Sequence, residues 1–340
     1  MDSQNLKDKV NDNYLGISGA IWCVLAGLCY GTMNVFAKMA YNKGLLVSRF
    51  VIMRFLMLGL CSYAYGRLFR NVDFNLTKYP VKLILMVFFR STMSMLSKSM
   101  QFAAIAYIPL TMSSCISFTT GPLIAALLAF IMIREKLNLQ EASAITLGIL
   151  GTMMLTMPQW FLWMNIDSDE IQKRLGKELK EYDHYFLGIV LALGSSALDQ
   201  CTYYIIRFIG EGIPKSLFPF ISGIYTTTIL LVYTQVTQPL DFGFFLRPAA
   251  ADPEHAFADQ EYKQAILLSL VGCTFGWIAL EFMIIGLRIS KSAVASYGEM
   301  AGLTIPFLCD AFIFGRQFLA IDALGVVLII GVQGFLAVQK

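Results

Sequence analysis

The chain has 340 residues, of which 57% are hydrophobic and only 14% are charged. Soluble domains carry about 25% charged residues, so this composition excludes an ordinary water-soluble globular protein. The formal net charge of +3 is small and spread along the chain, which argues against a nucleic-acid partner.

The residue types that most enzymes and metal sites need are scarce. Only two histidines occur, His184 and His255, and both lie in polar segments. All seven cysteines lie within apolar runs and form no Cys-x-x-Cys pair, so we expect small buried side chains and no disulfide framework. Because no nucleophile–base or metal-ligand constellation is visible, the sequence predicts neither an enzyme nor a bound metal or cofactor.

The chain begins with a polar segment of mixed charge, residues 1–15, which we predict to be a cytoplasmic tail. A bilayer core of about 30 Å requires roughly 20 apolar residues in a helix. Ten runs of this kind follow the tail, at residues 16–40, 46–66, 82–106, 109–132, 139–163, 185–208, 214–238, 263–287, 291–314 and 318–338. Pro109 separates the third run from the fourth. The pattern predicts an all-α integral membrane protein with ten transmembrane helices.

The basic residues of the loops predict the orientation of these helices. If the N-terminus is cytoplasmic, thirteen Lys and Arg residues lie on the cytoplasmic side and nine on the other. Because Lys and Arg are enriched in cytoplasmic loops, we expect both termini in the cytoplasm. The expected location is the plasma membrane or a membrane of the secretory pathway.

A long polar connection, residues 164–184, follows the fifth run. Apolar residues recur in it near helical spacing, with charges between them: Ile166, Ile171, Leu175, Leu179 and Tyr182. We predict an amphipathic helix that lies on the extracytoplasmic membrane surface. The alternative is a solvated loop helix without lipid contact. The second long connection, 239–262, contains three prolines and should be irregular.

The fourth and ninth runs share a pattern. Each opens with small residues, carries a proline near its middle (Pro122 or Pro306) and ends in a basic residue. Five runs separate the two, which is an odd number, so the two halves must cross the membrane in opposite directions. Inverted repeats with interrupted helices are typical of secondary transporters, with the binding site where the repeats meet. We predict two inverted five-helix repeats, at 16–163 and 185–338.

The stretch from Phe102 to Leu155 contains AAIAYIPLTMSS, TTGPLIAALLAF and IREKLNLQEASAITLGILGTMML. It resembles the EamA-type repeat of the drug/metabolite transporter superfamily. The stretch IIGLRISKSAVASYGEMAGLTIPFLCDAFIFGRQFLAIDALGVVLIIG is similar, with Gly315-Arg316 where the first copy has Arg134-Glu135. The single-chain layout resembles the solute carrier 35 branch, particularly its G-like members, which include organic-anion exporters. No stretch matches the segments that recognise nucleotide sugars in that branch.

Ionisable residues inside the apolar runs are the most informative chemical feature. The first half contributes cations and the second half contributes anions: Lys38, Arg54, Arg90 and Lys98 against Asp199, Glu281, Glu299 and Asp310. A charge near the bilayer centre costs about 3 kcal/mol or more, so each of these groups needs a partner or access to water. Lys38 and Asp310 lie near the outer ends of their helices, and we expect them to reach the membrane interface.

Three cations lie deeper and form the core of the predicted binding site. Arg90 and Lys98 are eight residues apart, about two helical turns, so both lie near one face of the third helix. Arg54 lies a turn or two inside the second helix. We predict that these side chains bind an anionic group of a substrate through charge-assisted hydrogen bonds. The alternative is that they form structural ion pairs.

Polar and acidic residues of the other central spans complete the predicted site: Tyr30, Asn34, Glu281, Tyr297 and Glu299. The two glutamates would hold the cations of the empty site, or would couple transport to protons. The alternative is a purely structural network, including Asp199, in which the charges pair across the repeats without touching a substrate.

The sequence therefore predicts a secondary active transporter that moves a small polar metabolite, with an organic anion favoured, by alternating access. Pro122 and Pro306 would supply the hinge points. The alternative is a transporter-fold membrane protein that acts as a structural or regulatory subunit. Two small-residue faces, Gly27–Gly31 and Gly272–Gly276, allow helices to approach closely, either inside the bundle or in a homodimer. The expected partners are a small-molecule substrate and the lipid bilayer.

Overall fold

The computed structural model describes residues 2–117, 120–121, 124, 139–156, 184–209, 212–214, 216–237, 259–289, 300–315, 321–328 and 331. The described part of the chain contains α-helices, 3₁₀ turns and short connections, with no strand. Its helices are α1 (Asp2–Asn42), α2 (Val47–Phe69), η1 (Leu76–Lys78), α3 (Val81–Tyr107), α5 (Leu139–Thr156), α7 (Tyr185–Ile209), α8 (Leu217–Thr237), α9 (Asp259–Ile289), η4 (Met300–Leu303) and α11 (Thr304–Phe312). Residues 110–117 and 321–328 are also helical.

Five of the described helices are long and apolar enough to cross a membrane: Ile21–Asn42, Val47–Phe69, Tyr185–Ile206, Leu217–Val236 and Glu261–Leu287. Their large apolar side chains also face outward, as Phe186, Phe208 and Val236 do, each at least 72% exposed. Many polar side chains are buried instead. A bilayer favours this distribution, because lipid solvates apolar surface and polar groups must find partners inside the protein. The prediction of a helical, multi-pass membrane protein is thereby confirmed in its coarse form.

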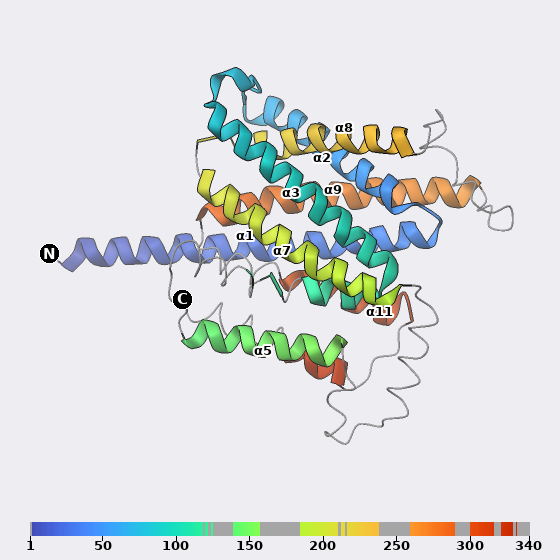
Figure 1. Ribbon diagram of the computed structural model, residues 1–340. Helices are drawn as coiled ribbons and strands as arrows, with labels where there is room; N and C mark the ends of the chain where they lie inside the picture. Colours follow the sequence, from blue (N-terminus) through green and yellow to red (C-terminus); the bar gives the residue numbers. More distant parts are fainter. Residues whose placement is uncertain are drawn as a thin grey trace.

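The helices of the two halves pack against each other in three pairs. α1 packs along α9, α3 along α7, and α2 along α8 (Figure 1). Each pair therefore joins one helix that precedes residue 164 to one that follows it.

Small residues allow the closest of these contacts. A Cβ atom added to Gly31 of α1 would lie 2.2 Å from the carbonyl oxygen of Gly302 in η4. Gly272 and Gly276 of α9 lie against Phe36 and Met33 of α1. These glycines of the predicted small-residue faces thus serve packing inside the bundle.

The break between the third and fourth spans lies where Pro109 predicts it. Pro109 has no N–H to donate to the carbonyl of Ile105, four residues earlier. Lys38 supplies the missing donor, with its Nζ atom 3.0 Å from that oxygen. On the other side of the break, the N–H of Thr111 donates to Oδ2 of Asp310 at 2.7 Å.

The expectation that Lys38 and Asp310 reach the membrane interface is therefore wrong. Both side chains are buried, because each satisfies a backbone group that the proline break leaves without a helical partner.

Two further differences concern the chain ends and loops. The first helix begins at Asp2, well before the apolar run at residue 16, since no proline interrupts the polar segment. The connection predicted to be irregular at 239–262 is already helical from Asp259. The predicted amphipathic helix at 164–184 and the hinge at Pro122 lie outside the described residues.

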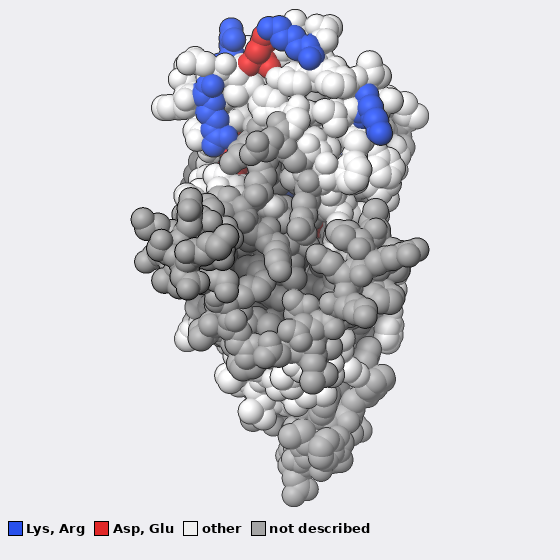
Figure 2. All heavy atoms as spheres, turned by 90° about the vertical axis from the view of Figure 1, so that its left-hand side faces the viewer, with Lys and Arg blue, Asp and Glu red and all other residues white. Residues whose placement is uncertain are grey.

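The connection between α2 and α3 is polar and basic. Arg67, Lys78 and Lys82 are exposed there, and Figure 2 shows Lys and Arg side chains over this end of the molecule. Lys78 donates a hydrogen bond to Asp73 and thereby lowers the pKa of its carboxyl group. Exposed basic residues therefore gather at this end of the described structure.

Candidate functional site

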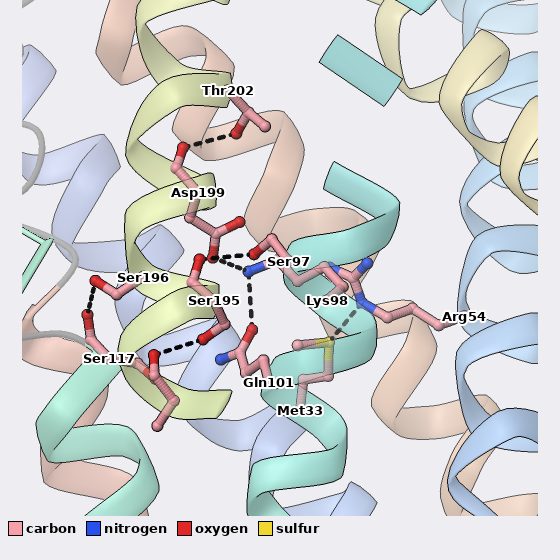
Figure 3. A network of polar contacts seen from close by, with 11 residues as sticks. Met33, Arg54, Ser97, Lys98, Gln101, Ser117, Ser195, Ser196, Asp199 and Thr202 are labelled. Carbon is pink, nitrogen blue, oxygen red and sulfur yellow. Dashed lines mark hydrogen bonds and ion pairs between the residues drawn. The ribbon is translucent and has the colours of Figure 1, made fainter. Parts of the chain in front are cut away.

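Lys98 lies at the contact between α3 and α7, where the two halves of the chain meet. Its ammonium group lies 2.5 Å from Oδ2 of Asp199 on α7 and 2.9 Å from Oε1 of Gln101, one turn along α3 (Figure 3). The ring of Tyr30 on α1 lies 5.3 Å from the same nitrogen. Lys98 is thus held by an acid, an amide and an aromatic face.

Arg90 lies two turns before Lys98 on α3 and is only 2% exposed. Its Nη1 atom donates to the hydroxyl of Ser222 on α8 at 2.7 Å, and Ser91 shares that hydroxyl at 2.8 Å. Its Nε atom is buried and has no hydrogen-bond partner within the described ranges of the chain. The hydrogen bond that this permanently charged guanidinium makes within the described part of the chain is thus to a neutral hydroxyl.

Arg54 projects from α2 toward the side of α3 that carries Lys98 (Figure 3). It is 4% exposed, and its Nε atom contacts the sulfur of Met33 at 3.3 Å. The rings of Phe55 and Phe102 lie 5.3 Å and 5.6 Å from its central carbon. Sulfur and aromatic rings compensate a buried cation only weakly compared with a carboxylate.

These three cations form one group, which we call the cation cluster (Arg54, Arg90 and Lys98). Arg54 and Asp199 both lie near enough to Arg90 to interact with its charge, as do Tyr30 and Tyr203. Among the described residues, Asp199 is the one carboxylate in ion-pair contact with a member of the cluster. The described site therefore holds more positive than negative charge.

Asn34 lies one turn beyond Tyr30 on α1 and is completely buried. Neither its amide nitrogen nor its amide oxygen has a hydrogen-bond partner among the residues that the structure describes. An unmade hydrogen bond at a buried amide costs about 1–3 kcal/mol. Gly31, on the same face of α1, packs against Gly302, so Asn34 lies on the side of α1 that faces the second half.

Glu281 lies away from the partners predicted for it. Its Oε2 atom lies 3.9 Å from Nη1 of Arg70, and no ion pair joins it to the cation cluster in the described part of the chain. The reason is its position about two turns before the end of α9, within reach of the long side chain that follows the last turn of α2. Glu299 and Tyr297, the other predicted members from the second half, lie outside the described residues.

The prediction named Asp199 only as part of a possible structural network, yet it is the acid that meets Lys98. Its place in the middle of an apolar span was a sufficient signal, equal to that of Glu281. Ser222 carried no comparable signal, because serine in membrane helices most often bonds its own backbone.

Comparison with known proteins shows which family the first half of the chain resembles. Residues 17–157 match the EamA-like transporter family. The match supports a multi-pass membrane protein and a role in the transport of small molecules. No curated protein sequence matches the chain.

The similarity in structure extends further than the similarity in sequence. A solved structure, described only as "Crystal structure of protein", covers 95% of this chain and 99% of its own with a TM-score of 0.63 and 13% identity. At that identity the likeness establishes a shared fold and nothing about the substrate. The fold therefore continues through the second half, beyond the segment that the EamA-like family matches.

Proposed function

We propose that the chain is a secondary active transporter that binds a small organic anion at the cation cluster and moves it by alternating access. The observation that carries this proposal is that Arg54 and Arg90 are buried with no carboxylate in ion-pair contact among the described residues. Burying such a charge in the membrane costs about 3 kcal/mol or more. A site that holds two of them is suited to a negative ligand.

The types of cation support the same conclusion. A guanidinium presents a rigid fork of N–H donors that matches the oxygens of a carboxylate or a phosphate. Lys98 adds a compact charge, and the unpartnered amide of Asn34 offers both a donor and an acceptor to a neutral polar group of the ligand. The expected substrate is therefore a small anion with further polar groups.

The packing of the helices supports two inverted repeats. If the halves are related by a twofold axis, the first, second and third spans correspond to the sixth, seventh and eighth. The contact of α1 with α9 then corresponds to that of α7 with α3, and the contact of α2 with α8 corresponds to itself. All three observed pairs satisfy this rule, and rocking of such halves about a site between them is the mechanism of many secondary transporters.

A screen of the purified chain tests the proposed substrate class. Melting temperatures would be measured with organic anions, nucleotide conjugates and amines, and we expect anions alone to stabilise the protein. Uptake of each anion that binds would then be measured in proteoliposomes. Charge reversal at Arg90 and Lys98 should abolish it, and unchanged uptake of every anion by that variant would refute the cation-cluster site.

The alternative, a structural or regulatory subunit, predicts a different outcome. Locked charges would resemble the pair of Lys98 with Asp199, which needs no ligand. In that case no compound of the screen would stabilise the protein, and the neutral variants Arg54→Gln and Arg90→Gln would leave every measured property except stability unchanged. In the described part of the chain Arg54 and Arg90 have no such locked pair, which favours transport.

A further inference from the structure

The ion pair between Lys98 and Asp199 blocks the one lysine of the cation cluster. The ammonium group of Lys98 donates hydrogen bonds to Asp199 and Gln101 (Figure 3), and the ring of Tyr30 also lies beside it. A substrate anion that uses Lys98 must therefore displace the carboxylate of Asp199. The pair also joins α3 to α7, so it opens or closes at the contact between the two halves.

We propose that Asp199 acts as an internal substitute for the substrate: it occupies Lys98 in the empty carrier and takes up a proton when a substrate anion displaces it. This inference rests on the proposed function, and it adds a coupling ion, H⁺, and a residue that carries it. Transport of the anion is then symport with protons.

The surroundings of Asp199 explain why a proton replaces the lost partner. From α3 it is paired with Lys98 and interacts with the charge of Arg90; the ring of Tyr30 on α1 lies beside Lys98, and Tyr203, one turn further on α7, also acts on Arg90. α9 also packs against α7, but its buried carboxylate, Glu281, pairs with Arg70. Lys98 and Arg90, the cations that act on Asp199, are therefore the same groups that would bind the substrate.

Once those cations bind the substrate, the displaced carboxylate is a second anion in a buried site. Protonation removes that charge, since a buried carboxylate without a partner is strongly disfavoured. The hydroxyl of Thr202 bonds the backbone oxygen of Asp199 at 2.7 Å, and so offers the carboxylate no compensation.

For a substrate bound as a monoanion the cycle balances in charge, and a dianion carried with one proton would move one net negative charge. The substrate anion binds to Lys98, which stays protonated, and one proton from the water on that side binds an Oδ atom of Asp199. After the halves reorient, the anion leaves, the proton returns to water on the second side, and the ion pair forms again. Because the empty carrier holds its own ion pair, it can reorient without a substrate, which permits net transport as well as exchange.

Proteoliposomes containing the full chain test this inference. The probes are radiolabelled succinate, a dicarboxylate, and radiolabelled glucose 6-phosphate, a phosphate ester; a pH-sensitive dye inside the vesicles reports protons. With wild-type protein we expect that an acidic exterior raises the initial rate of uptake several-fold, and that protons enter together with the transported probe. We expect Asp199→Asn to retain exchange of internal for external probe, to lose net uptake, and to lose the response to pH.

Two further variants separate this role from a structural one. Asp199→Glu keeps a carboxylate and should keep proton-coupled net uptake. Asp73→Asn makes the same chemical change at an exposed acid and should behave as wild type. If Asp199→Asn does not fold, the proton measurement on wild-type protein decides alone.

The possible failures are distinct. Wild-type uptake that ignores the proton gradient and brings in no protons would overturn the inference and leave the proposed function intact. Net uptake by Asp199→Asn with an unchanged pH response would also overturn it. If the wild-type chain moves neither probe nor any anion of the screen, the proposed function fails and this inference fails with it.

Discussion

Arg54 is a buried cation whose neighbours compensate its charge poorly. Its guanidinium lies among the sulfur of Met33 and the rings of Phe55 and Phe102, and it has no carboxylate partner among the described residues. These neighbours would suit an apolar side chain at least as well as a cation. A charge in these surroundings should reduce stability, and under the proposed function the same charge would serve to bind the anion.

Replacing Arg54 by methionine should separate these two effects. The Arg54→Met protein should melt at a higher temperature, because an uncompensated charge is replaced by a side chain that packs on Met33 and Phe102. Binding of the stabilising anion should weaken by about tenfold or more, since a charge-assisted hydrogen bond contributes about 1.5–3 kcal/mol. Differential scanning fluorimetry with and without the anion measures both effects.

Arg49 on the same helix provides the matched control. It is also buried, but it donates a hydrogen bond to the hydroxyl of Tyr262. Arg49→Met should therefore lower the melting temperature and leave anion binding nearly unchanged. A lower melting temperature for Arg54→Met, with an undiminished effect of the anion, would show that Arg54 is structural.

The sequence indicated that these cations are buried, but not what they face. Arg54, Arg90 and Lys98 were identified because they interrupt apolar runs, and all three are buried. The partners of Lys98 and Arg90 are Asp199 and Ser222, more than a hundred residues away. Which of several buried acids meets a given lysine depends on the register between two packed helices, and apolar periodicity does not encode that register.

Helix packing between α2 and α8 depends on two glycines at one crossing point. A Cβ atom on Gly223 would lie 2.4 Å from the Cα atom of Gly59 and 2.7 Å from the carbonyl oxygen of Phe55. A Cβ atom on Gly59 would meet its nearest neighbours only at 3.4 Å. The contact is therefore asymmetric, although both residues are glycines in helices.

This asymmetry predicts opposite effects on stability when each of the two glycines is replaced by alanine. Gly223→Ala should destabilise the protein by about 1–3 kcal/mol, because backbone atoms must separate to admit the side chain. Gly59→Ala should be neutral or slightly stabilising, since alanine favours the helix by up to about 1 kcal/mol. Melting temperatures of the two variants measure the difference. Equal effects would mean that α2 and α8 do not approach as closely as the structure shows.

The helices themselves were predicted well where the physical signal is local. The run at 46–66 corresponds to Val47–Phe69, and Pro109 ends the third span as expected. The 3₁₀ turn Met300–Leu303 before Pro306 was not predicted. It lies where Gly31 approaches Gly302, so a contact between distant segments shapes it, and no local pattern records that contact.

At the scale of the whole molecule, the three pairs of packed helices (α1 with α9, α3 with α7, and α2 with α8) join the two halves throughout. The hydrogen bonds of Lys98 and Arg90 across the halves run from α3 to Asp199 of α7 and to Ser222 of α8. Movement of one half against the other must therefore rearrange the site. Under the proposed mechanism the site would open to each side of the membrane in turn, so the orientation of the chain decides which side is the cytoplasmic one.

The two ends of α2 offer the test of orientation. Asn42 precedes this helix and Thr77 follows it, both side chains are exposed, and the basic residues gather at the Thr77 end. Because basic loops stay in the cytoplasm, a membrane-impermeant maleimide should label Asn42→Cys in intact cells and should label Thr77→Cys only after permeabilisation. All seven native cysteines are buried or half-buried, so the unaltered chain serves as the background.

For a chain held in a secretory-pathway membrane, selective permeabilisation of the plasma membrane should give the opposite order, with Thr77→Cys labelled first. Labelling of Thr77→Cys in intact cells would place the N-terminus outside and reverse the side from which Lys98 and Asp199 receive their substrate and proton.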